Sequence, residues 1–187
     1  MKEELRNQGK IQRQSLSEKE WLEKSRLIQE KLVCEPLYQQ AKVILCYVHT
    51  DREVRTDFII QQALVSGKTV CLPQVRWQER QLIASRIYSL DEIDHQGVVP
   101  RGIRLRPINS QELDLVITPG VLFDVFGNRI GMGGGFFDRF FKEITTKTKK
   151  VALAFSFQVR ETCLPVGQDD VPVDIIVTEE KVYYPGY

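Results

Sequence analysis

Apolar and polar positions follow helical spacing through the first part of the chain. Apolar residues between Leu5 and Leu32 recur at roughly helical intervals among charged residues, which predicts helices there. The segment Ser17-Glu18-Lys19-Glu20 has the pattern of a capping box, so a second helix is expected to begin at this point and to run to about Cys34. Pro36 is expected to close it.

The rest of the chain alternates short apolar runs with helix-like segments. Strands are expected at residues 43–48, 69–72, 82–87, 113–118, 150–155 and 174–178. Helices are expected at 56–66 and 136–146, a turn at 127–128, and a loop rich in Gly, Pro and Arg at 97–107. Pro73 is expected to stop the second strand. This alternation predicts one α/β domain over residues 1–187, with a mainly parallel sheet.

Composition narrows the class of protein. Apolar residues make up 42% and charged residues 27%, which is typical of a folded globular chain. The net charge of +1 provides no general field for nucleic acid or a membrane surface, so neither is expected as a partner. The charged N-terminal segment has no signal-peptide core, and we expect a cytoplasmic, monomeric protein. The four cysteines are spread singly, which argues against a zinc site.

A glycine cluster is the strongest candidate for chemistry. Gly131, Gly133, Gly134 and Gly135 stand within five positions, and a helix is expected to begin directly after them. Glycine lets backbone N–H groups approach an anion closely, and a helix N-terminus adds unpaired N–H donors. The cluster matches neither the P-loop nor the dinucleotide fingerprint. It therefore predicts a phosphate cradle, and a flexible surface turn is the competing interpretation.

Charged residues near this cluster suit a nucleotide and a metal. Arg129 can supply a cation to phosphates, and Asp138 can either complement the helix dipole or bind Mg²⁺, which prefers one or two carboxylates plus phosphate oxygens. Asp170 is a second candidate metal ligand, although three Asp residues in this segment also suit a solvated turn. Lys2 and Arg6 stand four residues apart and can grip an anion together, or simply be solvated.

These residues occur in an order that resembles the 5-formyltetrahydrofolate cyclo-ligase family. The matching stretches are Lys2-x-x-x-Arg6, Glu53-Val54-x-Thr56, residues 113–120, residues 127–140 around the glycine cluster, and Asp170-x-x-x-Asp174. The resemblance implies a three-layer α/β/α fold like that of sugar-phosphate isomerases and CoA transferases. It implies an enzyme that converts 5-formyltetrahydrofolate to 5,10-methenyltetrahydrofolate, with ATP as co-substrate, Mg²⁺ as cofactor, and ADP and phosphate as products.

The resemblance also implies roles for individual residues. Arg129 and Asp138 would be catalytic, and Asp138 and Asp170 would bind Mg²⁺. The expected folate contacts are Val48, Glu53, Met132, Gly133, Gly134, Gly135 and Phe136. The expected ATP contacts are Lys2, Arg6, Arg129, Ile130, Gly131, Met132, Gly133, Gly134, Gly135, Phe136 and Phe137.

Three positions depart from what is common in that family. Many members carry Arg or Tyr where this chain has Met132, and a Tyr-Tyr pair where it has Phe136-Phe137. These departures leave open a non-catalytic folate-binding relative. A sugar-phosphate isomerase or CoA-transferase-like enzyme that shares only the fold is a third interpretation, and it would not be expected to bind Mg²⁺-ATP.

Overall fold

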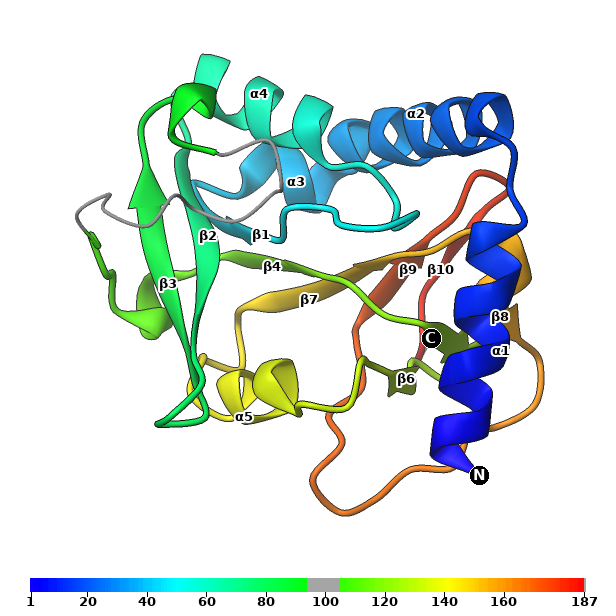
Figure 1. Ribbon diagram of the computed structural model, residues 1–187. Helices are drawn as coiled ribbons and strands as arrows, with labels where there is room; N and C mark the ends of the chain where they lie inside the picture. Colours follow the sequence, from blue (N-terminus) through cyan, green and yellow to red (C-terminus); the bar gives the residue numbers. More distant parts are fainter. Residues whose placement is uncertain (94–104, 187) are drawn as a thin grey trace.

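A seven-stranded sheet forms the centre of the molecule in the computed structural model, which describes residues 1–93 and 105–186 (Figure 1). The strand order is β10-β9-β7-β4-β1-β2-β3. The strands are β1 (Val43–Cys46), β2 (Thr69–Arg76), β3 (Gln81–Ile87), β4 (Leu115–Thr118), β7 (Lys149–Leu153), β9 (Ile175–Val177) and β10 (Val182–Tyr183). Strands β2, β1, β4, β7 and β9 are parallel, and only the outer pairings β2–β3 and β9–β10 are antiparallel. The predicted α/β class with a mainly parallel sheet is confirmed.

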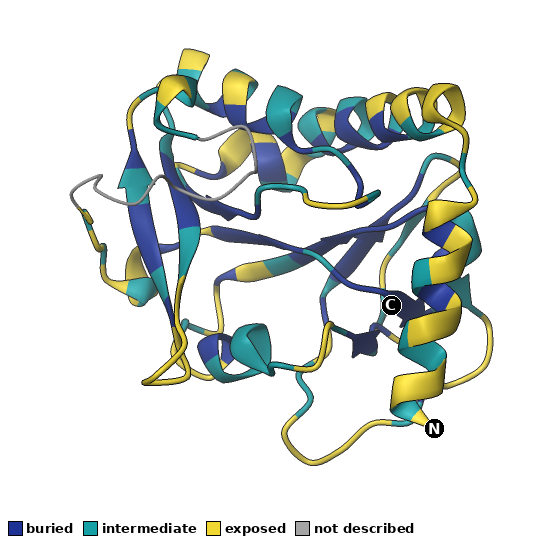
Figure 2. Cartoon of the chain, viewed as in Figure 1, coloured by how far each residue is buried: buried dark blue, intermediate teal, exposed yellow. Residues whose placement is uncertain are grey.

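Different layers cover the two faces of this sheet. One face packs against α2 (Glu18–Cys34), α3 (Pro36–Gln40) and α4 (Asp57–Val65) in the largest apolar cluster. The other packs against α5 (Phe136–Phe141) and a small sheet of β6 (Arg129–Ile130), β5 (Leu122–Asp124) and β8 (Val159–Arg160). Figure 2 shows the buried residues concentrated in the central strands and in the parts of the outer layers that face them. The three-layer expectation holds in outline, with a mixed second outer layer; the specific likeness to isomerases and CoA transferases stays a prediction, as does the single-domain assignment.

Local sequence explains the elements that were predicted well. In the capping box, Ser17 Oγ accepts from the Glu20 backbone N–H at 3.3 Å, and Glu20 Oε2 accepts from the Ser17 N–H at 2.9 Å. Strands β1 and β4 are almost continuously apolar because helices or the second outer layer cover both of their faces.

Two local predictions were wrong, and a third was right but incomplete. β2 continues through Pro73 to Arg76, because β1 pairs only with residues 69–71 and the missing N–H of Pro73 costs no hydrogen bond to β1. Pro36 follows the end of α2 at Cys34, as predicted; it also begins α3, which was not predicted, because its fixed φ suits the first helical position. The helix after the glycine cluster ends at Phe141 rather than near Thr146. The predicted loop at 97–107 lies mostly outside the described residues.

Helix α1 (Lys2–Gln14) lies against the small sheet (Figure 1). A Cβ at Gly9 would stand 2.6 Å from Val121 Cγ1 and 2.9 Å from the Val121 carbonyl oxygen, so only glycine permits this close approach. The approach fixes where the cationic side chains of α1 lie. Among the helices that the structure describes, none is long and apolar enough to cross a membrane.

Candidate active site

The glycine turn at 131–135 connects β6 to α5 and leaves its backbone donors available. Gly133 and Gly135 have φ of 106° and 63°, a region that strongly favours glycine. The Gly131 carbonyl accepts from Arg6 Nε at 2.9 Å, and the Gly134 carbonyl accepts from Arg139 Nη2 at 2.8 Å. The backbone N–H groups of residues 131–135 donate to no other described residue. Because these two carbonyls are engaged and the N–H groups are open, the turn suits an anion.

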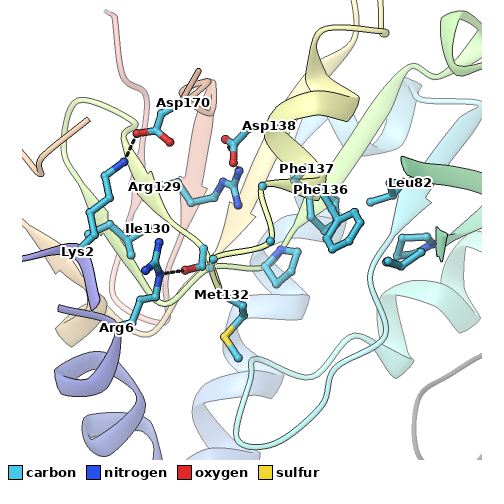
Figure 3. A pocket seen from close by; sticks show the side chains of 18 residues that line it. Lys2, Arg6, Leu82, Arg129, Ile130, Met132, Phe136, Phe137, Asp138 and Asp170 are labelled. Carbon is cyan, nitrogen blue, oxygen red and sulfur yellow. Dashed lines mark hydrogen bonds and ion pairs between the residues drawn. The ribbon is translucent and has the colours of Figure 1, made fainter. Parts of the chain in front are cut away.

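This turn forms one side of a cavity of about 270 Å³ (Figure 3). Side chains from α1, from β2 and β3, from the β6–α5 segment and from the 167–171 loop line it together. The lining residues are Lys2, Arg6, Pro73, Val75, Leu82, Pro119, Gly120, Arg129, Ile130, Gly131, Met132, Gly133, Gly134, Gly135, Phe136, Phe137, Asp138 and Asp170. The fold therefore brings together every residue that was expected to contact ATP or Mg²⁺.

Two pairs of opposite charges stand in the cavity. Arg129 Nη2 donates to Asp138 Oδ1 at 2.7 Å, and Lys2 Nζ forms an ion pair with Asp170 (Figure 3). The backbone N–H of Val171 also donates to Asp138 Oδ1, at 3.3 Å, which places the 170–171 segment beside Asp138. Sequence spacing had left it open whether the two aspartates meet; the structure places them on the same cavity.

Burial sets the electrostatics of these pairs. Burial lowers the pKa of Arg129, and the negative charges of Asp138 and Asp170 act against this change. Arg129 Nε has no hydrogen-bond acceptor among the described residues, so one donor of a buried guanidinium is unfilled. Partial burial would raise the pKa of Asp170, but hydrogen bonds from Lys2 and from the Gly167 N–H hold that pKa below its usual value. Asp170 therefore suits the role of an anionic ligand.

An apolar wall faces the glycine turn, and sequence reasoning missed it. Pro73 and Val75 from β2 and Leu82 from β3 form this wall, and Trp77 stacks edge-on against Phe136 at a centroid distance of 4.9 Å. The expectation that Pro73 ends a strand hid these residues. The alternation of apolar and polar residues from residue 73 to 76 was the signal that could have revealed them.

Glu53 and Val48 do not line this cavity. Both follow β1, and Pro119 and Gly120 of the cavity follow the neighbouring parallel strand β4, so the two regions lie at the same edge of the sheet. Glu53 is buried at 8% exposure; its Oε2 accepts from the N–H and Oγ1 of Thr50 at 3.0 and 3.3 Å. Burial raises the pKa of Glu53, while the Thr50 hydrogen bonds and Arg13 lower it.

The helix dipole contributes less than the sequence indicated. α5 has only six residues, and Gly135 caps it with a left-handed backbone rather than with a side chain. The macrodipole depends on several aligned peptide units. Local backbone donors and the cations of Lys2, Arg6 and Arg129 therefore account for most of the attraction for an anion.

A cradle of backbone donors, three cations and two carboxylates lies at the edge of a parallel sheet, an arrangement of an α/β fold that suits the binding of a polyphosphate. Residues 1–179 match the model of the 5-formyltetrahydrofolate cyclo-ligase family, and the chain belongs to that family.

Individual relatives agree with this assignment. The chain is 37% identical over 147 residues to 5-formyltetrahydrofolate cyclo-ligase of Haemophilus influenzae, with 74% of this chain and 77% of the relative covered. It is 29% identical to the mouse cyclo-ligase, with 95% and 93% covered. The solved structure of Aquifex aeolicus 5,10-methenyltetrahydrofolate synthetase superposes with a TM-score of 0.85 at 31% identity, covering 100% of this chain and 93% of that one.

Proposed function

We propose that this protein converts 5-formyltetrahydrofolate to 5,10-methenyltetrahydrofolate with consumption of ATP, and that the cavity around the glycine turn holds the polyphosphate. Family membership supports the reaction. The observation that supports the location is the turn itself: Arg6 and Arg139 bind the carbonyls of Gly131 and Gly134, while the N–H groups of the turn donate to no other described residue.

The chemistry explains why such a cradle is needed. Joining the formyl carbon to N10 requires loss of the formyl oxygen, which is a poor leaving group. Transfer of the γ-phosphoryl group to this oxygen makes it leave as phosphate when N10 attacks. In phosphoryl transfer a protein mainly positions the reactants and stabilises negative charge. Lys2, Arg6 and Arg129 supply the positive charge, and the glycine turn supplies donors of fixed direction.

The donor set fits Mg²⁺ only in company with a nucleotide. Among the described residues there is no group of three or more His, Cys, Asp or Glu side chains that could hold a metal ion by themselves. Asp138 and Asp170 provide two carboxylates, and Mg²⁺ takes its other ligands from phosphate oxygens and water. We infer that these two residues hold the metal, which when bound neutralises charge developing on the phosphates.

The ion pairs in the cavity predict that Mg²⁺ and ATP bind together. Asp138 and Asp170 are each paired with a cation that is expected to contact phosphate, Arg129 and Lys2 respectively. Binding of Mg²⁺-ATP would exchange these partners: the phosphates take the two cations, and the carboxylates turn to the metal. Either component alone would leave charges unpaired, so the two components should bind together.

Glu53 is the proposed contact for the folate. It lies at the same edge of the sheet as the cavity, and one of its carboxylate oxygens accepts no hydrogen bond from a described residue. A reduced pterin offers N–H donors along one edge, which a carboxylate can accept. Val48, in the same loop region, would add an apolar contact. A cytoplasmic location, a monomeric state and the absence of nucleic-acid or membrane partners stay predictions.

An absorbance assay tests the reaction. Purified protein with 5-formyltetrahydrofolate, ATP and Mg²⁺ should form the methenyl chromophore and release ADP in equal amounts, and omission of ATP should abolish both. Folate binding without turnover would instead support the non-catalytic alternative raised by Met132, Phe136 and Phe137.

Calorimetry tests the exchange of partners. ATP should bind much more tightly with Mg²⁺ than without it, and Mg²⁺ alone should bind weakly. Tight binding of Mg²⁺ in the absence of ATP would contradict the exchange, whatever the activity.

A further inference from the structure

Arg13 is a buried cation at the far end of the helix that carries Lys2 and Arg6. It lies in the last turn of α1, seven residues beyond Arg6, which is about 10 Å along the helix axis. Its side chain is 2% exposed and is among the largest fully buried side chains of the protein. One short helix therefore reaches both the proposed nucleotide region and the loop that follows β1.

The guanidinium of Arg13 faces two carboxylates without hydrogen-bonding to either. Its Nη1 lies 3.6 Å from Glu53 Oε1, and its Nη2 lies 3.8 Å from Asp51 Oδ2. Nε and Nη2 are buried and have no hydrogen-bond acceptor among the described residues. A guanidinium that loses its hydration on burial and gains only long ion pairs contributes little to the stability of the fold. The placement therefore points to an effect on Glu53 rather than to a structural role.

Glu53 is fixed everywhere except at the oxygen that faces Arg13. Its Oε2 is held by Thr50, and its backbone carbonyl accepts from Trp21 Nε1 at 2.7 Å. Its Oε1 accepts no hydrogen bond from a described residue and has the Arg13 guanidinium at 3.6 Å. Oε1 is thus an oriented acceptor with a positive charge behind it and no partner of its own.

We propose that Arg13 is a positioning residue for folate binding, which orients the Glu53 carboxylate and stabilises its charge so that Oε1 can accept the N–H donors of the substrate. This proposal rests on the proposed contact between Glu53 and the folate. It assigns to α1 a second task, beside the cations at its N-terminal end.

The charges around Glu53 agree with this role. Arg13 faces it from α1, Asp51 from the same loop, and the buried Tyr47 from the end of β1, with its hydroxyl donating to the Val54 carbonyl. Burial raises the pKa of Glu53, and Arg13 is a cation that opposes the rise. Loss of the Arg13 charge should therefore shift protonation of Glu53 to higher pH.

Calorimetric titration of Arg13 variants tests the proposal. Arg13→Met should weaken binding of 5-formyltetrahydrofolate about tenfold, as loss of an orienting partner does elsewhere. Binding of Mg²⁺-ATP should stay unchanged, and the pH midpoint of folate binding should rise. Arg13→Lys should restore most of the affinity and the midpoint. Arg26→Met is the matched control, because Arg26 is 59% exposed and forms its ion pair with Glu30 on the same helix, α2.

Several outcomes would overturn the proposal. Unchanged folate affinity and midpoint in Arg13→Met would reject it, and so would an equal loss of folate and Mg²⁺-ATP affinity, which marks a packing role. Arg13→Gln, polar and neutral, carries the same expectation if the methionine variant does not fold. Glu53→Gln tests the contact between Glu53 and the folate separately from the role of Arg13. Unchanged folate affinity in that variant would refute the contact itself. With Glu53→Gln in place, Arg13→Met should have no further effect.

Discussion

The cavity at the glycine turn and the surroundings of Glu53 differ in how closely their opposite charges are paired. In the cavity each carboxylate has a close cation: Asp138 is 2.7 Å from Arg129, and Asp170 is paired with Lys2. Around Glu53 the cation Arg13 stays 3.6 Å away and has unfilled donors. The cavity must break its ion pairs to receive a ligand, whereas Glu53 only needs to accept a new hydrogen bond. A doubly charged complex suits the first region, and a neutral ring with N–H donors suits the second.

Removing one carboxylate from the cavity at the glycine turn should have the largest effect on activity. We expect Asp138→Asn to lower kcat/KM by about 100-fold or more, because a neutral amide neither balances Arg129 nor binds a cation. Methenyl formation measures the loss, and thermal unfolding shows whether the fold is kept. Asp169→Asn is the matched control, since Asp169 is 91% exposed, pairs with Lys142 and does not line the cavity. Equal activity of the two variants would refute the role of Asp138.

A steric change in the turn should have an intermediate effect. A Cβ at Gly134 would stand 2.7 Å from the Phe136 ring, so Gly134→Ala should displace that ring and lower kcat/KM about tenfold, or about 1.4 kcal/mol. Gly67→Ala is the contrast: a Cβ there meets nothing within 4 Å but sits at a φ of 74°, so it should cost stability and leave the rate unchanged. Full activity of Gly134→Ala would show that the turn adapts freely.

Lys2 is a partly exposed residue of the cavity at the glycine turn, and its loss should lower activity less. Lys2→Met should raise the KM for Mg²⁺-ATP about fivefold, roughly 1 kcal/mol, because its ion pair is 35% exposed on the lysine side. The KM for 5-formyltetrahydrofolate should stay the same. A rise confined to the KM for 5-formyltetrahydrofolate would instead indicate that Lys2 acts in folate binding, together with Glu53.

The smallest effect concerns His49, beside Glu53. Burial lowers the pKa of His49, with Asp57 opposing the change and Arg55 adding to it. Between that lowered pKa and the ordinary value of about 6.5 the unfolded chain binds more protons, so His49 contributes stability above about pH 6.5 that is lost as the pH falls. Its Nδ1 accepts from the Thr56 N–H at 3.4 Å, an interaction that requires the neutral ring. His49→Asn should flatten this slope in denaturant titrations between about pH 5 and 7; an unchanged slope would contradict it.

Local chemistry made much of the fold predictable. The capping box at Ser17 and Glu20 works through neighbours three residues apart, and it was placed correctly. Pro73 was misread because its effect depends on whether a strand pairs on its N–H side, which is a fact about β1 rather than about Pro73. The short strands β5, β6, β8 and β10 were missed because two or three residues carry no periodicity.

In the site too, features set by neighbouring residues could be predicted, and contacts between distant residues could not. The glycine cluster could be recognised because its composition requires a special backbone. Lys2, Arg6 and Asp170 were only weak candidates from their spacing, and the family resemblance favoured them over a solvated role. The contact between Asp138 and the Val171 N–H joins residues 33 positions apart, and no spacing rule predicts it. Arg13 went unnoticed because an arginine on a charged amphipathic helix is ordinarily solvated, and only its 2% exposure sets it apart.

The two tryptophans of this chain happen to mark the two regions separately. Trp77 stacks against Phe136 at the cavity, and Trp21 donates to the Glu53 carbonyl with Arg52 above its ring at 5.1 Å. Replacing either tryptophan by phenylalanine would leave a single tryptophan, whose emission can be excited selectively over that of the six tyrosines. Emission from Trp77 would then report occupation of the cavity, and emission from Trp21 would report the folate end. Mixing each variant rapidly with one substrate at a time would give the order in which the two ends of the site fill.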